Sequence, residues 1–179
     1  LDLNVLAAGK PFLGIGAFET SPDGTRLMYS TDETGFRQYD LRVRDMATGT
    51  ETAEVIPKTT AAAWTADGKT VFYVVEDAAK RPYRAYRHVI GSDPGSDALV
   101  YEETDERYEL DCWLSQSGAY VILHSGSMLT TEVRLVDAKR PESAPMLVAP
   151  RIEGQEYYVE HAPTSAGGKV VDRLVIRVN

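Results

Sequence analysis

The sequence has few of the residues that build covalent or metal-bound frameworks. It holds one cysteine, Cys112, and three histidines among 179 residues. A single cysteine excludes an intrachain disulfide and favours a reducing compartment, so we expect a cytoplasmic location, with the periplasm as the alternative. Neither Cys112 nor any of His88, His124 and His161 has a partner at the spacing of a metal site. We therefore expect no metal and no cofactor.

Long apolar runs and an excess of basic residues are also absent. No apolar stretch approaches the ~18 residues of a membrane span, and no cationic leader precedes Leu1, so we expect no membrane segment and no signal peptide. Nineteen basic residues against 27 acidic ones give a net charge of −8. This charge argues against a nucleic-acid partner, which needs a basic face. Because the chain opens on Leu rather than Met, we expect a processed or trimmed piece.

A turn followed by an apolar run occurs three times. The three copies are SPDGTRLMYS at 21–30, TADGKTVFYV at 65–74 and SQSGAYVILH at 115–124. Each copy begins with Ser or Thr, has glycine at its fourth position and turns apolar three residues later. The three glycines are spaced by 44 and 50 residues, and spacings of this size are typical of repeat architectures.

The chemistry of these turns predicts hairpins. A hydroxyl at the first position can accept a hydrogen bond from the backbone two residues on, and Pro22 presets the backbone at the second position. The glycine then takes the left-handed conformation that closes a hairpin with a small bulge. Three copies in register argue against three unrelated turns.

Alternating and apolar segments between the turns predict about four antiparallel strands per unit. The expected strands are 17–20, 26–31, 38–44 and 53–56 in the first unit, 61–65, 71–76, 82–90 and 98–101 in the second, and 109–114, 120–125, 131–136 and 146–148 in the third. The fourth unit has two, 157–161 and 173–178, joined by an enlarged turn at 163–169.

This pattern predicts an all-β fold, a partial β-propeller of about three and a half four-stranded antiparallel blades. A leading segment, 1–16, would precede the propeller domain, 17–179, whose blades would span about 17–57, 60–102, 108–149 and, incompletely, 156–179. A sandwich or barrel would not explain the periodicity. Because three and a half blades cannot close a ring, we expect a fragment of a larger propeller that self-associates through its open edge.

Several runs of residues are similar to those of one family. They are GAFE at 16–19 before SPDG at 21–24, RPY at 81–83 with RH at 87–88, LVYEE at 99–103 with DER at 105–107, TEVR at 131–134, and APR at 149–151 with Gly154 and EY at 156–157. In this order they resemble the N-terminal β-propeller of prolyl oligopeptidase-type serine peptidases, most closely the oligopeptidase B branch. The segment 112–114 and the enlarged turn depart from that pattern, and no part of the chain corresponds to the family's hydrolase domain.

The resemblance implies a serine peptidase that cleaves small peptides after Arg or Lys. Its catalytic triad would lie in a C-terminal α/β-hydrolase domain, which is the expected partner and is absent from these residues. The propeller would cover that domain and screen substrates by size. These 179 residues alone would then be no enzyme and hold no catalytic residue. The alternative is a non-catalytic propeller that serves as a protein-interaction scaffold.

Four local features could still carry chemistry. Ser125-Gly126-Ser127 is the nearest match to a Gly-x-Ser-x-Gly nucleophile elbow, but it lacks the flanking glycines in register, so we predict a loop. Gly14-Ile15-Gly16 lacks the third glycine of a dinucleotide loop, so we predict a flexible lead into the first strand. Beside Trp113, Cys112 is predicted to be a buried, inert thiol. The three histidines are predicted to be structural, because a triad needs a Ser and a carboxylate beside one of them in space.

The acidic run 102–107, EETDER, is the strongest local concentration of charge. It could draw cationic peptides toward the protein. A solvated loop between two blades is the favoured alternative.

Overall fold

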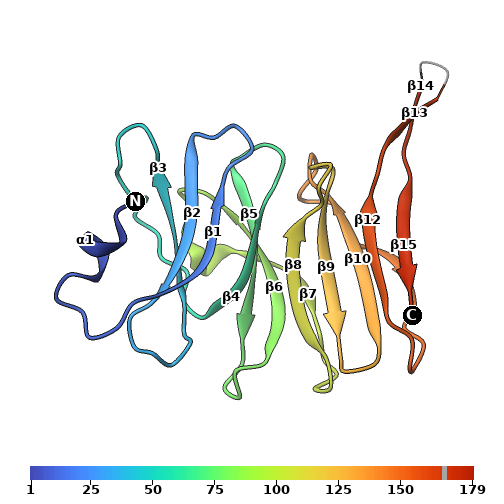
Figure 1. Ribbon diagram of the computed structural model, residues 1–179, viewed down its shortest axis with the longest axis horizontal. Helices are drawn as coiled ribbons and strands as arrows, with labels where there is room; N and C mark the ends of the chain where they lie inside the picture. Colours follow the sequence, from blue (N-terminus) through green and yellow to red (C-terminus); the bar gives the residue numbers. More distant parts are fainter. Residues whose placement is uncertain (167–168) are drawn as a thin grey trace.

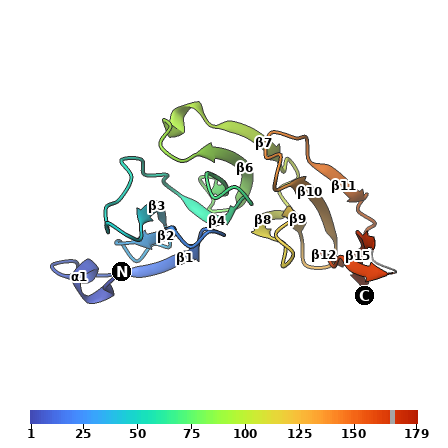
Figure 2. The same cartoon turned by 90° about the horizontal axis from the view of Figure 1, so that it is seen from above.

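The computed structural model describes residues 1–166 and 169–179. Its strands form antiparallel sheets that stand side by side along an arc, as Figures 1 and 2 show. This arrangement confirms the predicted all-β fold and partial β-propeller. Helix α1 (Leu3–Ala7) precedes the first sheet and is capped by Asp2, whose carboxylate accepts a hydrogen bond from the Asn4 N–H at 2.9 Å.

The first sheet has three strands where four were predicted. β1 (Gly14–Thr20), β2 (Arg26–Asp32) and β3 (Asp40–Asp45) pair in that order. The outer segment meets β3 only in isolated bridges, Leu41 with Ile56 and Arg44 with Glu51. The prediction of a strand at 53–56 is therefore wrong.

The hydrogen bonds of this outer segment explain the difference. Ile56 exchanges two backbone hydrogen bonds with Leu41, at 2.8 and 3.0 Å, and the Thr52 N–H donates to the Val43 carbonyl at 2.9 Å. Leu41 and Val43 are two residues apart on β3, but their partners Ile56 and Thr52 are four residues apart on the outer segment. The extra residues of the outer segment interrupt the strand pairing. The side chain of Glu54 turns toward the second sheet and accepts a backbone hydrogen bond there at 2.8 Å.

The second and third sheets each have the four strands expected. The second contains β4 (Thr59–Trp64), β5 (Thr70–Glu76), β6 (Pro82–Val89) and β7 (Ala98–Glu102), with the 3-10 helix η1 (Pro94–Ser96) before β7. The third contains β8 (Glu109–Leu114), β9 (Tyr120–Gly126), β10 (Thr131–Asp137) and β11 (Met146–Ala149). In both sheets, strand order follows chain order.

The last sheet pairs β12 (Tyr157–His161) with β15 (Leu174–Val178). A second hairpin, β13 (Thr164–Ala166) and β14 (Lys169–Val171), occupies the region predicted to be an enlarged turn. Gly167 and Gly168, which belong to that predicted turn, lie outside the described residues. Among the described strands, β15 pairs with β12 alone.

The three repeated turns form tight hairpins at corresponding positions. Gly24, Gly68 and Gly118 have φ of 71°, 63° and 70°, in the left-handed region that glycine adopts without strain. Each glycine N–H donates to the carbonyl three residues earlier, at 2.8, 3.2 and 2.8 Å. In the first turn the Ser21 hydroxyl accepts from the Arg26 N–H at 3.0 Å, which is five residues on rather than the two predicted.

One hydrophobic cluster lies at each seam between neighbouring sheets. The first seam buries eight residues around Trp64 and Met28, the second buries ten around Phe72 and Leu123, and the third buries five around Ile122. Full burial of such side chains contributes about 1.5–3 kcal/mol each. Strand periodicity supplies both faces: Val71 and Tyr73 face the first seam, whereas Phe72 faces the second.

The strands define two ends of the molecule. The connections between sheets, 57–58, 103–108 and 150–156, lie at one end together with the β5–β6 and β9–β10 turns, at the bottom of Figure 1. We call it the connection end. The opposite end carries the three repeated turns, and we call it the repeat-turn end.

Candidate functional site

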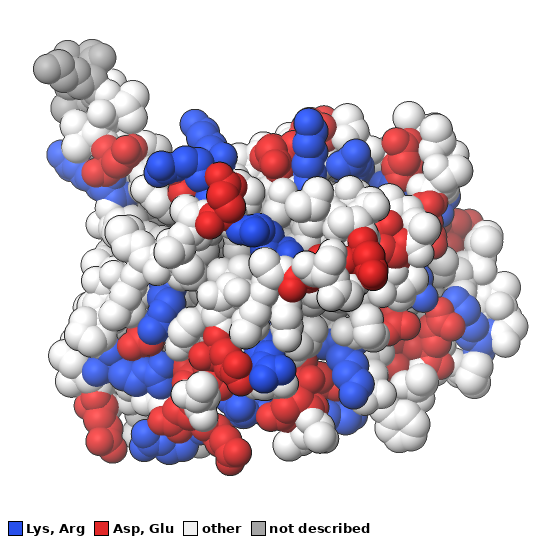
Figure 3. Space-filling view, turned by 180° about the vertical axis from the view of Figure 1, so that it is seen from behind, with Lys and Arg blue, Asp and Glu red and all other residues white. Residues whose placement is uncertain are grey.

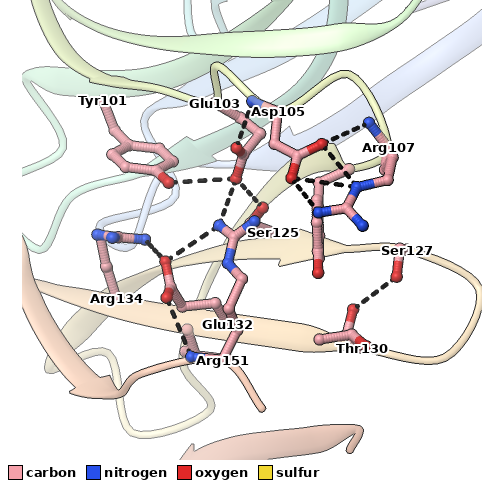
Figure 4. A network of polar contacts seen from close by, with 12 residues as sticks. Tyr101, Glu103, Asp105, Arg107, Ser125, Ser127, Thr130, Glu132, Arg134 and Arg151 are labelled. Atoms are coloured by element: carbon pink, nitrogen blue, oxygen red, sulfur yellow. Dashed lines mark hydrogen bonds and ion pairs between the residues drawn. The ribbon is translucent and has the colours of Figure 1, made fainter. Parts of the chain in front are cut away.

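An ion-pair network joins two connections at the connection end (Figure 4). Arg151 Nη2 donates to Glu103 Oε2 at 2.6 Å and to Glu132 Oε1 at 3.2 Å. Glu132 also pairs with Arg134, and the Ser125 hydroxyl donates to Glu103. Two carboxylates that are 3% and 6% exposed are thus balanced by two guanidinium groups. Such compensation is what allows charges to remain in an interior.

The network sets the ionisation of both acids. Burial disfavours the charged form of Glu103, but hydrogen bonds from Arg151 and Ser125 outweigh it, and the pKa of Glu103 lies below its ordinary value. Burial likewise opposes ionisation of Glu132, and Arg151 and Arg134 outweigh it, so the pKa of Glu132 is lowered as well. Both groups are therefore anions at neutral pH.

The acidic run 102–107 is largely neutralised by its own surroundings. Asp105 forms a two-nitrogen contact with Arg107, with a shortest distance of 2.7 Å, and that contact lowers the pKa of Asp105 to about 2. Glu102 pairs with Arg84 at 3.1 Å. Because Glu103 is buried, the prediction of a solvated loop is wrong for this residue. Since Glu102, Glu103 and Asp105 are paired with arginines, the run attracts cationic peptides only weakly.

The face seen in Figure 3 carries acidic and basic side chains interspersed, without a large field of one sign. The net charge of −8 is therefore not concentrated on that face.

A hollow of about 380 Å³ opens between β4, β8 and the start of β6. Glu109 and Asp111, both on its wall, share one face of β8 and have no ion-pair partner among the described residues. His124, paired with Asp111 across the strands, lies beside them, and its Nε2 is buried without a hydrogen-bond partner there. We call this the acidic hollow. Two unpaired carboxylates beside an imidazole suit a cationic or hydrogen-bond-donating group.

The surroundings of the acidic hollow shift the pKa values of Asp111 and His124. Nearby protein atoms displace water, which raises the pKa of Asp111 although its side chain keeps solvent access. Burial lowers the pKa of His124 against the opposing charge of Asp111. The imidazole stacks on Tyr158 at 5.5 Å and tilts against Trp113 at 5.7 Å, so its ring orientation is fixed.

A second hollow, of about 520 Å³, lies beside the β9–β10 turn. Its walls include Tyr108, Met128 and Leu129, and Arg107 and Glu153 lie at its rim. We call it the apolar hollow.

The structure gives Ser125 and Ser127 structural contacts. Ser125 and Gly126 belong to β9, so the prediction of a loop is wrong for these two residues; the hydroxyl of Ser125 is buried against Glu103. Ser127 begins the following turn, where its hydroxyl donates to the Thr130 carbonyl at 3.2 Å.

His88 is fully buried in a polar cluster between the first two sheets. Its Nδ1 lies 2.9 Å from Asp97, which also accepts from the Tyr73 hydroxyl at 2.9 Å. Its Nε2 lies 3.7 Å from Glu54. These contacts attach the irregular outer segment of the first sheet to β6.

His161 has the neighbours that a triad would require. Its Nδ1 lies 2.7 Å from the Ser117 hydroxyl, and its Nε2 lies 3.5 Å from Asp172. However, the Ser117 oxygen already accepts from the Ala119 N–H at 3.2 Å, and the Gly118 N–H that could stabilise an oxyanion is bound within the turn. We assign this contact as a link between the β8–β9 turn and β12.

Cys112 and Gly16 both lie in closely packed surroundings. Cys112 is 4% exposed in the second seam, where burial raises the pKa of its thiol well above the ordinary value. Gly14, Ile15 and Gly16 form the start of β1 and not a flexible lead. A Cβ on Gly16 would meet Ser30 Oγ at 2.5 Å, so glycine is required there by space.

Within residues 1–166 and 169–179, no group of three His, Cys, Asp or Glu side chains is arranged to hold a metal ion. No helix in this part of the chain is both long and apolar enough to span a membrane.

The family described as "Prolyl oligopeptidase, N-terminal beta-propeller domain" matches residues 1–179. The chain belongs to this family, the N-terminal propeller of prolyl oligopeptidase-family proteins, and its partial propeller is similar to that of oligopeptidase B.

Individual relatives agree. Dipeptidyl aminopeptidase BI of Pseudoxanthomonas mexicana is 35% identical over all of this chain, and Protease 2 of Moraxella lacunata is 34% identical over 90% of it; the match covers 24% of each relative. The oligopeptidase B structure from Trypanosoma brucei, with covalently bound antipain in a closed form, is similar with a TM-score of 0.81, 27% identity, and coverage of 99% of this chain and 26% of that one. The structure from Leishmania major gives 0.85 at 24% identity, over 97% and 26%.

The chain thus spans about a quarter of the length of these relatives. In this family the catalytic domain is separate from the propeller.

Proposed function

We propose that the chain is the substrate-gating propeller of a serine oligopeptidase that cleaves small peptides after Arg or Lys. The catalytic hydrolase part would belong to the same longer polypeptide. The acidic hollow carries this proposal, because Glu109 and Asp111 are carboxylates without an ion-pair partner among the described residues, and they lie on β8. Together with β4, this strand lies on the inner side of the arc (Figure 2). A basic peptide side chain is a suitable occupant for such a site. The name oligopeptidase B of the similar structure from Trypanosoma brucei supports the oligopeptidase part of this proposal.

The test uses the full-length parent protein and a peptide with one arginine. Replacing that arginine by uncharged citrulline keeps the shape of the side chain and removes its charge. We expect hydrolysis after arginine and none after citrulline. We also expect kcat/KM to fall as the same site is placed in longer peptides. Equal rates for long and short peptides would contradict gating, and absence of any hydrolysis would favour a scaffold.

The variant Asp111→Asn tests the acidic hollow itself. We expect a loss in kcat/KM for the arginine peptide of roughly tenfold, which corresponds to the loss of about one favourable charge contact. Glu142→Gln, which changes an exposed acid between β10 and β11 at the repeat-turn end, is the matched control. An equal loss in both variants would mean that only overall charge matters.

A further inference from the structure

Exposed apolar side chains gather at the connection end. Phe36, in the β2–β3 turn, is 68% exposed, and Ile152, in the β11–β12 connection, is 60% exposed. Met128 and Leu129, adjacent in the β9–β10 turn, are 90% and 62% exposed. The repeated turns at the opposite end carry Asp-Gly, Asp-Gly and Ser-Gly. Other exposed apolar side chains, among them Met46 and Met146, lie at the opposite end. Met128 and Leu129 differ from these two because they are adjacent and line an apolar hollow, which is typical of an interaction surface.

The β9–β10 turn holds its two apolar residues in a fixed position. The Ser127 N–H donates to the Thr130 carbonyl at 2.8 Å and closes the turn. The Thr130 hydroxyl accepts from the Gly154 N–H at 2.9 Å, which ties the turn to the connection leading into β12. Met128 and Leu129 are therefore presented by an ordered turn, and little entropy would be lost on contact with a partner.

The apolar hollow beside this turn has the layout of a small interface. Tyr108, Met128 and Leu129 form its apolar part, and Arg107 and Glu153 supply charges of both signs at its rim. The Arg107 side chain is 72% exposed. An apolar centre with a polar rim is how protein interfaces are built, and the volume of about 520 Å³ accommodates one or two large side chains.

We propose that Met128, Leu129 and the apolar hollow anchor the catalytic portion of the longer polypeptide. This inference rests on the proposed function. The curated relatives are about four times as long as the matched region, and a parent protein of that length would supply the partner from outside residues 1–179. The strands on the inner side of the arc, β1, β4, β8 and β12, all begin at the connection end (Figures 1 and 2), where that partner can contact several blades at once. A second copy of the chain and an unrelated protein are outcomes of the test.

Methionine oxidation measures this docking directly. Met28 is fully buried, whereas Met46, Met146 and Met128 are 47%, 53% and 90% exposed. Exposure governs oxidation by peroxide, so an undocked propeller would oxidise Met128 fastest. In the full-length parent protein, we expect Met128 to oxidise about tenfold more slowly than Met46 and Met146. Mass spectrometry of the digested protein reports all four sites in one sample, with Met28 as the protected reference.

Oxidation of Met128 at the rate of Met46 or faster would overturn the proposal. Protection that appears only at concentrations where sedimentation detects a dimer would also overturn it, in favour of a second copy. Hydrolysis of the arginine peptide by the same sample is scored separately, so an active enzyme with an unprotected Met128 would refute the docking and leave the proposed function standing.

A double variant, Met128→Ser with Leu129→Ser, provides a second readout. We expect limited proteolysis between the propeller and the catalytic portion to become several-fold faster, because the anchor is lost. Met46→Ser, at the repeat-turn end, is the control and should leave that rate unchanged. Equal rates in the double variant and the parent protein would contradict the anchor.

Discussion

Arg151 donates to Glu103 over 2.6 Å, although the two residues lie 48 positions apart and belong to successive connections between sheets. The ring of Tyr108 lies 3.9 Å from the same guanidinium carbon and adds a cation–π contact. One side chain thereby fixes the connection before the third sheet to the connection after it. Removing one partner of such a pair costs more than the pair contributes, because a buried charge is left without compensation.

We expect Arg151→Met to lower the free energy of unfolding by about 2–4 kcal/mol, since Glu103 and Glu132 would remain buried as anions. Chemical denaturation of the variant and of the original chain measures the difference. Arg140→Met is the control, because Arg140 pairs with Asp137 while 72% exposed, and it should cost less than about 1 kcal/mol. Equal losses for the two variants would contradict the role of burial.

The same network predicts a pH dependence. The folded pKa values of Glu103 and Glu132 lie below the ordinary 4.5, so their ion pairs stabilise the fold fully above that pH and lose this contribution as pH falls through the lowered values. In Arg151→Met, protonation would instead relieve the buried charge of Glu103, which has no other ion-pair partner among the described residues, and that of Glu132, which keeps Arg134 alone. We therefore expect the stability gap between the two proteins to shrink below about pH 4.5. A gap that stays constant in acid would argue against the assignment.

Gly16→Ala should destabilise the first sheet. The new Cβ would lie 2.5 Å from Ser30 Oγ and 2.9 Å from the Tyr39 ring, and it would disturb the hydrogen bond from the Ala17 N–H to Ser30 Oγ at 2.9 Å. We expect a loss of about 1–3 kcal/mol, measured by denaturation. Combining it with Ser30→Ala removes the closest atom, so the double variant should lose less than the sum of the two single changes.

Cys112 should resist thiol reagents while the protein is folded. Its side chain is 4% exposed, and burial favours the protonated thiol, whereas alkylation requires the thiolate. Time courses with a coloured thiol reagent should show no fast reaction in buffer and full reaction in denaturant. Rapid labelling of the folded chain would show that the second seam opens readily.

The sequence predicted the elements whose signals are local. The Ser/Thr-x-x-Gly turns placed three hairpins, because glycine alone enters the left-handed region cheaply, and alternation placed most strands within a few residues. The strand prediction failed at 53–56. The residues there favour a strand, but the hydrogen-bonding positions of this segment do not match those of β3. Spacing between strands is a property of two segments, and one segment cannot reveal it. Self-association through the open edge stays a prediction.

The candidate sites divide in the same way. Glu109 and Asp111 alternate with buried Leu110 and Cys112. This alternation could have predicted that the two acids share one face of β8. Nothing in the sequence connects Arg151 with Glu103, since their contact depends on how two sheets are placed in space. The exposure of Met128 was also invisible, because methionine in a short turn between strands resembles an ordinary core residue.

The separate clusters at the three seams make the molecule a linear chain of nearest-neighbour couplings. Among the residues that the structure describes, no cluster spans more than two sheets, so separating one pair of sheets leaves the clusters between the other pairs in place. The third seam, with five buried residues against ten in the second, is the weakest link. If the third seam opened, the first three sheets would keep the clusters they share, whereas the β12–β15 hairpin would lose the only buried cluster that the described residues give it. A two-stranded hairpin alone is marginally stable, so the end of the chain that carries β12 and β15 should be the first part to unfold.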